Sequence, residues 1–310
     1  MITLLWPVVI GLACSASGAA APPPTRSEAP FLIAITVDDL PAHGPLPATI
    51  SRAAIAQAYV AVLKAHRVPG AFGFVNAARI DREPGSEAVL DIWRKAGYPL
   101  GNHSFSHLNI GRAASFDAWK TDVEKGEPAV ARRMRGRDWH FFRFPNLARG
   151  AGEQQAAAAK FLEGRGYRLA DVSVAFGDWV YSDAYVRCLE KGDQASIVTM
   201  KAQYLAGVDD GIAHMKAVSQ RIYGRVIPQV LLTHLGAWSV ATMREVMAKL
   251  DAAGAKYVTL PQAQSDPAYA AAAALPGGGS IMERTAKARN IDLSSIAPLR
   301  VGVDVKQLCR

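Results

Sequence analysis

Apolar positions fall into two patterns that alternate along most of the chain. Short apolar runs of strand length are typical of strands buried on both faces. Seven such runs occur at Phe31–Val37, Ala71–Val75, Tyr98–Leu100, His140–Arg143, Tyr167–Val174, Val230–Thr233 and Tyr257–Leu260. Segments with apolar residues at helical spacing lie between them, and such alternation predicts a parallel sheet covered by helices. Seven strands favour a closed or nearly closed barrel over a short open sheet.

Polar residues and glycines set the expected helix ends. Ser115 and Ser239 precede amphipathic stretches and are expected to be N-caps. Residues 184–222 are predicted to be helical and are longer than a connection needs, so they form an insertion. Residues 31–265 are expected to form the main domain, and 266–310 a C-terminal extension.

The amino terminus has the pattern of a targeting segment. An apolar run up to Ala13 is followed by small residues to Ala21, which is typical of a signal peptide over 1–21. Leu12–Ala13–Cys14 offers an alternative, a lipoprotein signal that would leave a lipid anchor on Cys14. Both interpretations place the protein outside the cytoplasm, in the periplasm or the extracellular space. The proline-rich residues 22–30 predict an extended linker.

Composition and charge exclude several classes. Half of the residues are apolar and 20% are charged, which excludes a disordered chain. No apolar run is long enough for a transmembrane span. The net charge is +8, but the basic residues are scattered, so no nucleic-acid partner is expected. Export would place Cys188 and Cys309 in an oxidising compartment, where they could form a disulfide. Two free thiols are the alternative, because the sequence does not give the distance between the two residues.

Polar residues with catalytic potential follow several of the predicted strands. They are Asp38 and Asp39, His103 and His107, Arg143, Asp178 and Trp179, and His234. In α/β barrels the carboxyl ends of the strands carry the active site. Segments far apart in sequence are therefore expected to meet at one rim.

His103 and His107 have a spacing that suits a metal. Two imidazoles four positions apart on a helical turn can reach one ion. Asp38 and Asp39 are adjacent acids, which repel each other unless one binds a cation. Two histidines and one carboxylate would leave open positions for water and substrate. These residues alone do not decide which aspartate is the ligand, and a solvated histidine pair beside a surface turn is the alternative.

Five ordered motifs resemble those of polysaccharide deacetylases, carbohydrate esterase family four. The motifs are Thr36–Asp39, His103–His107, Arg143–Asn146, Asp178–Trp179 and Leu232–His234. The resemblance covers residues 30–263. It implies a distorted (β/α) barrel, which agrees with the alternation of strands and helices.

The resemblance implies a role for each matching residue. Asp38 would be the general base, oriented by Arg143. Asp39, His103 and His107 would bind one divalent metal, with zinc favoured and cobalt, nickel, manganese or iron as alternatives. His234 would be the general acid, tuned by Asp178. Trp179 and Leu232 would form apolar walls for the acetyl methyl group, and a backbone N–H near Asn146 would stabilise the oxyanion.

The chain departs from the family pattern at two positions. Leu40 stands where the family usually has glycine. His43 nearby is expected to be a solvated loop residue, and a contact with the substrate is the alternative. Asn146 stands where the family usually has tyrosine, so an aromatic wall is lost while a backbone donor for the oxyanion is kept.

The expected function is an exported metal-dependent hydrolase that deacetylates N-acetylated sugar polymers or oligomers, of the chitin-oligosaccharide or peptidoglycan type. Its partner would be an acetylated glycan, such as one associated with a cell wall. Hydrolysis of another amide or of an O-acetyl ester is one alternative, and a non-catalytic glycan-binding protein is another. A non-haem iron oxygenase is disfavoured, because such sites usually lie in β-sandwich barrels.

Overall fold

The computed structural model describes residues 29–299 and 304–310. The predicted signal sequence 1–21, with Cys14, and residues 22–28 of the predicted linker lie outside the described residues. In the part that is described, no helix combines the length and the hydropathy needed to cross a membrane.

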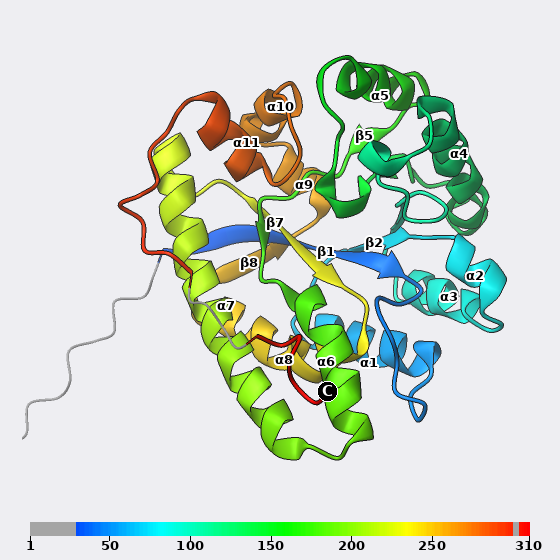
Figure 1. The fold of residues 1–310 in the computed structure, drawn as a ribbon. Helices are drawn as coiled ribbons and strands as arrows, with labels where there is room; N and C mark the ends of the chain where they lie inside the picture. Colours follow the sequence, from blue (N-terminus) through cyan, green and yellow to red (C-terminus); the bar gives the residue numbers. More distant parts are fainter. Residues whose placement is uncertain (1–28, 300–303) are drawn as a thin grey trace, which may run out of the picture.

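One parallel sheet forms the centre of the molecule (Figure 1). Seven strands lie in the order β5-β4-β3-β2-β1-β7-β6, and an eighth, β8, pairs with the first residues of β1. The strands are β1 (Phe31–Leu40), β2 (Phe72–Val75), β3 (Leu100–Asn102), β4 (Phe141–Phe142), β5 (Arg168–Leu169), β6 (Val174–Ala175), β7 (Gln229–His234) and β8 (Ala255–Val258). The distorted (β/α) barrel predicted from the sequence is confirmed. It is open between β5 and β6, the strands at the two ends of this order.

The predicted single strand over Tyr167–Val174 is wrong, because this run is divided between the two ends of the row. β5 pairs with β4, whereas β6 pairs with β7. The residues between β5 and β6 extend the pairing at both ends of the sheet. The N–H of Ala170 donates to the carbonyl of Phe142 in β4, and the N–H of Ser173 donates to the carbonyl of Val230 in β7. The apolar run therefore crosses the opening of the barrel instead of forming one strand.

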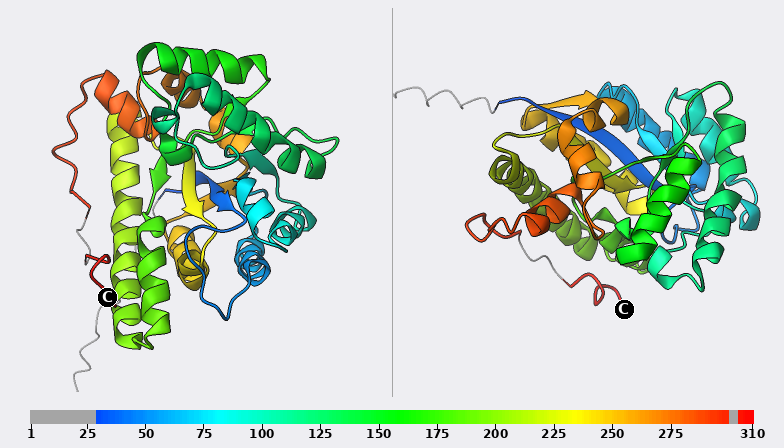
Figure 2. Two further views of the ribbon diagram at one scale, coloured as in Figure 1. Left: turned by 45° about the vertical axis from the view of Figure 1, so that its right-hand side comes forward. Right: turned by 90° about the horizontal axis from the view of Figure 1, so that it is seen from above.

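Helices cover the outside of the sheet, and the long α7 runs beside α6 at one side of the molecule (Figures 1 and 2). The helices are α1 (Arg52–Ala65), α2 (Ala78–Arg82), α3 (Glu87–Lys95), α4 (Phe116–Arg133), α5 (Gly152–Gly164), α6 (Ser182–Glu190), α7 (Gln194–Tyr223), α8 (Ala237–Ala252), α9 (Leu260–Gln264), α10 (Pro267–Ala273) and α11 (Ile281–Ala288). Short 3-10 turns lie at Ile110–Arg112, Pro145–Leu147 and Asp178–Tyr181. The predicted insertion 184–222 corresponds to α6 and α7.

Of the two predicted N-cap residues, Ser115 is confirmed and Ser239 is not. Ser115 caps α4 by accepting a hydrogen bond from the N–H of Ala118 at 3.0 Å, as predicted. Ser239 is not the cap of α8, because that helix begins at Ala237. Its hydroxyl donates instead to Asp178 at 2.9 Å, so the predicted capping residue belongs to the functional site.

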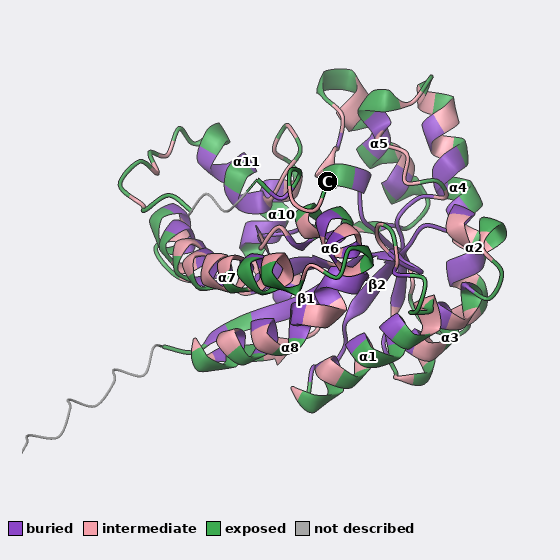
Figure 3. Cartoon of the chain, turned by 60° about the horizontal axis from the view of Figure 1, so that its bottom comes forward, coloured by how far each residue is buried: buried purple, intermediate pink, exposed green. Residues whose placement is uncertain are grey.

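The C-terminal residues are packed against the barrel. Side chains of α10 and α11 enter an apolar cluster that also contains Phe72 and Val230. Residues of the sheet and of the inner faces of the helices are buried (Figure 3). Arg284 of α11 forms a buried ion pair with Asp171 at 2.8 Å. Cys188 and Cys309 form a disulfide with 5.1 Å between their Cα atoms, which decides between the two alternatives left by the sequence.

Candidate metal and catalytic site

A cavity of about 250 Å³ lies at the carboxyl ends of the central strands. Eight of the ten residues that the sequence singles out line it: Asp38, Asp39, His103, His107, Asn146, Trp179, Leu232 and His234. The other two, Arg143 and Asp178, lie behind the wall and bond to residues that line it. The structure therefore brings all ten predicted residues together.

An irregularity in β1 turns both adjacent acids toward this cavity. Neighbouring side chains of a regular strand point to opposite faces. Between Val37 and Leu40 the register with β2 shifts, as in a β-bulge, and Asp39 has a φ of 64°. Asp38 and Asp39 can thus line one cavity.

Asp39, His103 and His107 could hold a metal ion. Oδ1 of Asp39 lies 3.6 Å from Nε2 of His103 and 3.5 Å from Nε2 of His107. Ligands bound to a tetrahedral zinc at about 2.0–2.1 Å would lie roughly 3.4 Å apart. This Oδ1 is buried and has no hydrogen-bond partner among the described residues, a costly state that a cation would relieve. The residues present therefore fit a divalent ion.

Both histidines are held in the form that binds metal. Nδ1 of His103 lies 2.7 Å from the carbonyl oxygen of Arg143, so it carries the proton and Nε2 is left as the ligand atom. Burial, followed by the charge of His103, lowers the pKa of His107 to about 4. The imidazole of His107 is therefore neutral at neutral pH, as a metal ligand must be.

Hydrogen bonds to α4 hold the segment that carries His103 and His107. Asp122 of α4 accepts hydrogen bonds from the N–H and the hydroxyl of Ser106. Gly126 lets this helix approach closely, because a Cβ there would lie 2.5 Å from Oδ1 of Asn102. Ser104 and His107 both have φ near 63°. Such strained backbone is typical of functional sites.

Arg143 holds the other aspartate. Its Nη1 donates to both oxygens of Asp38, at 3.0 and 3.2 Å, and its other nitrogens bond to Ala170 and Thr36. The Arg143 side chain is 1% exposed, so the ion pair is shielded from solvent. This arrangement fixes the carboxylate of Asp38 beside the Asp39, His103 and His107 cluster.

His234 is oriented by Asp178. Nδ1 of His234 lies 2.9 Å from Oδ1 of Asp178, and the backbone N–H of His234 donates to Oδ2 at 2.7 Å. Burial opposes the imidazolium, but the carboxylates of Asp178, Asp39 and Asp38 outweigh it and raise the pKa of His234 to about 9. The side chain is therefore a protonated donor at neutral pH.

His43 is part of the site, so the expectation of a solvated loop residue is wrong. Its Nδ1 lies 2.6 Å from Oδ2 of Asp39, and its ring lies 4.7 Å from that of His234. The loop after β1 folds back over the site, where the N–H of His43 bonds to the carbonyl of Leu235. The only signal in the sequence is the position of His43 four residues after Asp39.

Apolar side chains form the remaining wall. The Trp179 ring is 5.4 Å from that of His234, and Leu232 precedes His234 on β7. Asn146 and Leu147 have φ of 57° and 53°, and the side chain of Asn146 accepts a hydrogen bond from Asn109 at 3.1 Å. The cavity thus has a charged side and an apolar side.

Comparisons with known proteins support the predicted family. Residues 26–164 match the family model described as polysaccharide deacetylase. The chitin deacetylase of the fungal pathogen Colletotrichum lindemuthianum is 18% identical, with a TM-score of 0.51, over 76% of this chain and 87% of that one. A carbohydrate esterase family four pseudoenzyme from Bacillus anthracis is 14% identical, with a TM-score of 0.50, over 76% of this chain and 65% of that one. No curated protein has a matching sequence.

Proposed function

Since residues 26–164 match the polysaccharide deacetylase family model, we propose that the protein is an exported, metal-dependent hydrolase that removes acetyl groups from N-acetylated glycans. The observation that carries this proposal is the cluster of Asp39, His103 and His107 beside a carboxylate and an imidazolium. A chitin-oligosaccharide or a peptidoglycan strand is the substrate class that we propose.

The metal ion would be held by Asp39, His103 and His107. Three nitrogen and oxygen ligands suit zinc, and the fourth position would stay open for water and substrate. When bound, the ion would polarise the acetyl carbonyl and lower the pKa of water at this position. The orphaned Oδ1 of Asp39 supports this ligand set over one that contains Asp38, whose oxygens Arg143 already contacts.

Asp38 would act as the general base. It lies next to the metal ligands, with Oδ2 3.6 Å from Nε2 of His103, and can accept a proton from the attacking water. Arg143 would hold the carboxylate in the correct orientation. A backbone N–H near Asn146 would donate to the oxygen that becomes negative, a contribution worth roughly 10²–10³ in rate.

His234 would act as the general acid. The nitrogen released when the C–N bond breaks is too basic to leave without a proton. A pKa of about 9 keeps His234 protonated until the proton is needed, and Asp178 holds the ring so that its other nitrogen faces the cavity. General acid catalysis of this kind typically contributes about 10²–10⁴-fold.

Acetate release tests the proposal. The purified protein is stripped with a chelator, and each divalent metal is then restored in turn against N-acetylated glucosamine oligomers, peptidoglycan and O-acetylated xylan. We expect release from the N-acetylated sugars that is lost on chelation and recovered with zinc. Release from the O-acetyl ester alone would replace the amide assignment. A metal-loaded protein without release from any of them would instead indicate glycan binding without catalysis.

A further inference from the structure

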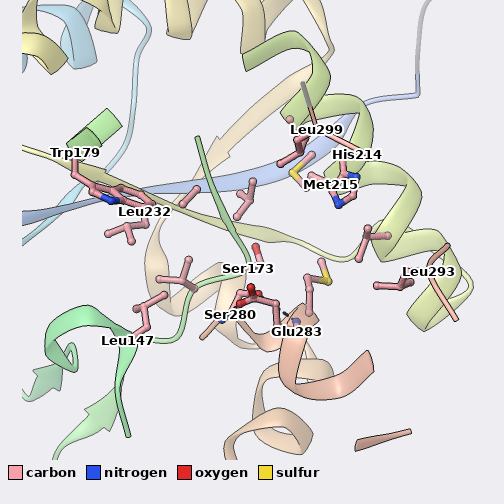
Figure 4. Close-up of a pocket in the computed structure, with 16 residues that line it drawn as sticks. Leu147, Ser173, Trp179, His214, Met215, Leu232, Ser280, Glu283, Leu293 and Leu299 are labelled. Atoms are coloured by element: carbon pink, nitrogen blue, oxygen red, sulfur yellow. Dashed lines mark hydrogen bonds between the residues drawn. The ribbon is translucent and has the colours of Figure 1, made fainter. Parts of the chain in front are cut away.

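A second cavity, of about 370 Å³, adjoins the site and has a largely apolar lining (Figure 4). Val174 of β6, Met215 and Val218 of α7, and Met282 of α11 contribute buried side chains to it. Apart from Leu147, its walls come from residues after 164, beyond the part that matches the family model.

The polar side chains around this cavity are already engaged elsewhere. The hydroxyl of Ser173 donates to Gln229 at 2.7 Å and accepts from the N–H of Val230. Ser280 and Glu283 form the capping box of α11 and bond to each other's backbone. His214 bonds to the carbonyl of Ala297 at 3.1 Å. A ligand would therefore meet mainly hydrocarbon.

Three side chains belong to both cavities. Leu147, Trp179 and Leu232 line the cavity with the catalytic residues and also the apolar one. In Figure 4 they lie together at one end of the apolar cavity, opposite Leu293 and Leu299. The apolar side of the catalytic cavity thus continues into the second cavity, away from the carboxylates and histidines.

We propose that this apolar cavity binds the acyl chain of the substrate, and that the protein removes acyl groups longer than acetyl from an N-acylated sugar. The inference rests on the proposed hydrolase function and names its substrate class. The acyl group ends in hydrocarbon, whereas a glycan continues on the other side of the scissile bond with polar groups. An apolar cavity of about 150 Å³ accepts benzene, so this one has room for an acyl chain of on the order of ten carbons.

The chemistry is the hydrolysis proposed above with a different acid as product. The water oxygen bonds to the acyl carbon, one of its protons passes to Asp38 and the other stays on the oxygen. The C–N bond breaks, its electron pair stays on nitrogen, and nitrogen takes a proton from His234. The products are the free amino sugar and a fatty acid, which loses its remaining proton to solvent and becomes a carboxylate. Return of a proton from Asp38 to His234 through solvent restores both residues, and no further reactant is required.

Substrates of graded acyl length test the proposal. Glucosamine oligomers carrying N-acetyl, N-butyryl, N-hexanoyl or N-octanoyl groups are compared by kcat/KM with the zinc-loaded protein. Burial of one methylene favours binding roughly fourfold, so we expect kcat/KM to rise with length and to exceed the acetyl value at least about tenfold for octanoyl. A maximum at acetyl would overturn the inference and leave the deacetylase proposal intact.

Ala175 provides a variant that narrows the cavity. It lies on β6 opposite Leu232 and lines only the apolar cavity of the two. We expect Ala175→Leu to lower the octanoyl-to-acetyl ratio of kcat/KM about tenfold or more. Ala159→Leu, at an exposed position of α5, is the matched control, and circular dichroism checks that both variants fold. An unchanged ratio in a folded Ala175→Leu protein would contradict the proposal.

Direct binding separates this inference from the catalytic proposal. Titration calorimetry with octanoate is expected to show a single site that Ala175→Leu weakens and Ala159→Leu does not. This result would support the acyl site even for a protein that hydrolyses none of the oligomers, whereas absence of binding would refute it. N-acetylated sugars with octyl aglycones are tested last. Rates that depend on aglycone length and not on acyl length would show that the cavity binds the leaving group, and this result would overturn the proposal.

Discussion

Asp38 and Asp39 are adjacent in sequence, yet they have different partners. Asp38 is paired with Arg143, whereas Oδ1 of Asp39 faces two imidazoles and Oδ2 bonds to His43. Burial raises the pKa of Asp39, but His43 and the nearby histidines outweigh it and lower the pKa well below its usual range. The difference in partners supports a division between a metal ligand and a general base.

His107 provides the simplest test of the ligand set. We expect His107→Ala to lose zinc on dialysis, because two ligands hold zinc far more weakly than three. Atomic emission of the dialysed protein measures the metal content. His140→Ala, at the residue before β4 and outside the cavity, is the matched control and should keep the metal. Full zinc content in His107→Ala would remove this residue from the ligand set.

His43 is expected to orient the Asp39 carboxylate. Loss of a hydrogen bond to a metal ligand typically lowers metal affinity about 10–100-fold, and we expect this loss for His43→Ala. His43→Asn can place an amide nitrogen near the position of Nδ1 and should recover part of the affinity. Competition with a chromophoric chelator measures both values. Equal zinc affinity in wild type and His43→Ala would show that the contact does not support the metal site.

Asp178 controls the pH range in which His234 carries its proton. The pKa of His234 is raised to about 9 in the folded protein, so catalysis that needs the imidazolium should fall as pH rises through 9. Asp178→Asn removes the largest favourable charge, and we expect the basic limb of the kcat profile to shift toward 6.5. The ion pair between Asp178 and His234 also contributes to the free energy of unfolding. This contribution is fully present below about pH 6.5 and is lost as the pH rises through 9. An unshifted limb in Asp178→Asn would exclude His234 as the group that titrates.

At the scale of secondary structure, the strand ends were predictable and the loops were not. Each predicted polar residue follows an apolar run, and parallel strands bring their carboxyl ends to one rim, so the sequence placed all ten residues near each other. The position of His43 depends on how the loop after β1 folds over β7, and no periodic pattern encodes it. The division of the run over Tyr167–Val174 was equally hidden, because it depends on which strands pair at the opening of the barrel.

The disulfide fixes the C-terminal segment to the insertion. Cys309 is bonded to Cys188 of α6, and Arg187 donates to the carbonyls of Val305 and Leu308. In the chain-entropy model a bridge closing a loop of this length contributes roughly 4–5 kcal/mol. We expect Cys309→Ser to lower the free energy of urea unfolding by up to this amount. The difference between wild type and variant should vanish under reducing conditions, and its persistence would assign the effect to packing.

On the scale of the whole molecule, the rim of the barrel and the added helices have separate tasks. The central strands carry the charged residues of the catalytic cavity, whereas β6, α7, α11 and the segment after it build the apolar cavity next to it. The motifs of the family resemblance contain the charged residues of the first part, and of the second they contain only the shared wall residues Trp179 and Leu232. The second part is decided by packing between segments far apart in sequence, and for that reason the acyl specificity could not be read from the motifs.

The most direct measurement of the central claim is the metal content and the turnover of Asp38→Asn beside wild type. The substitution keeps the shape of the side chain and removes the base, while Asp39, His103 and His107 stay in place. We predict one equivalent of zinc in both proteins and acyl hydrolysis that is slower in Asp38→Asn by about 10²–10⁴-fold. Loss of zinc together with activity would make Asp38 a ligand, and wild-type turnover would contradict its role as the base.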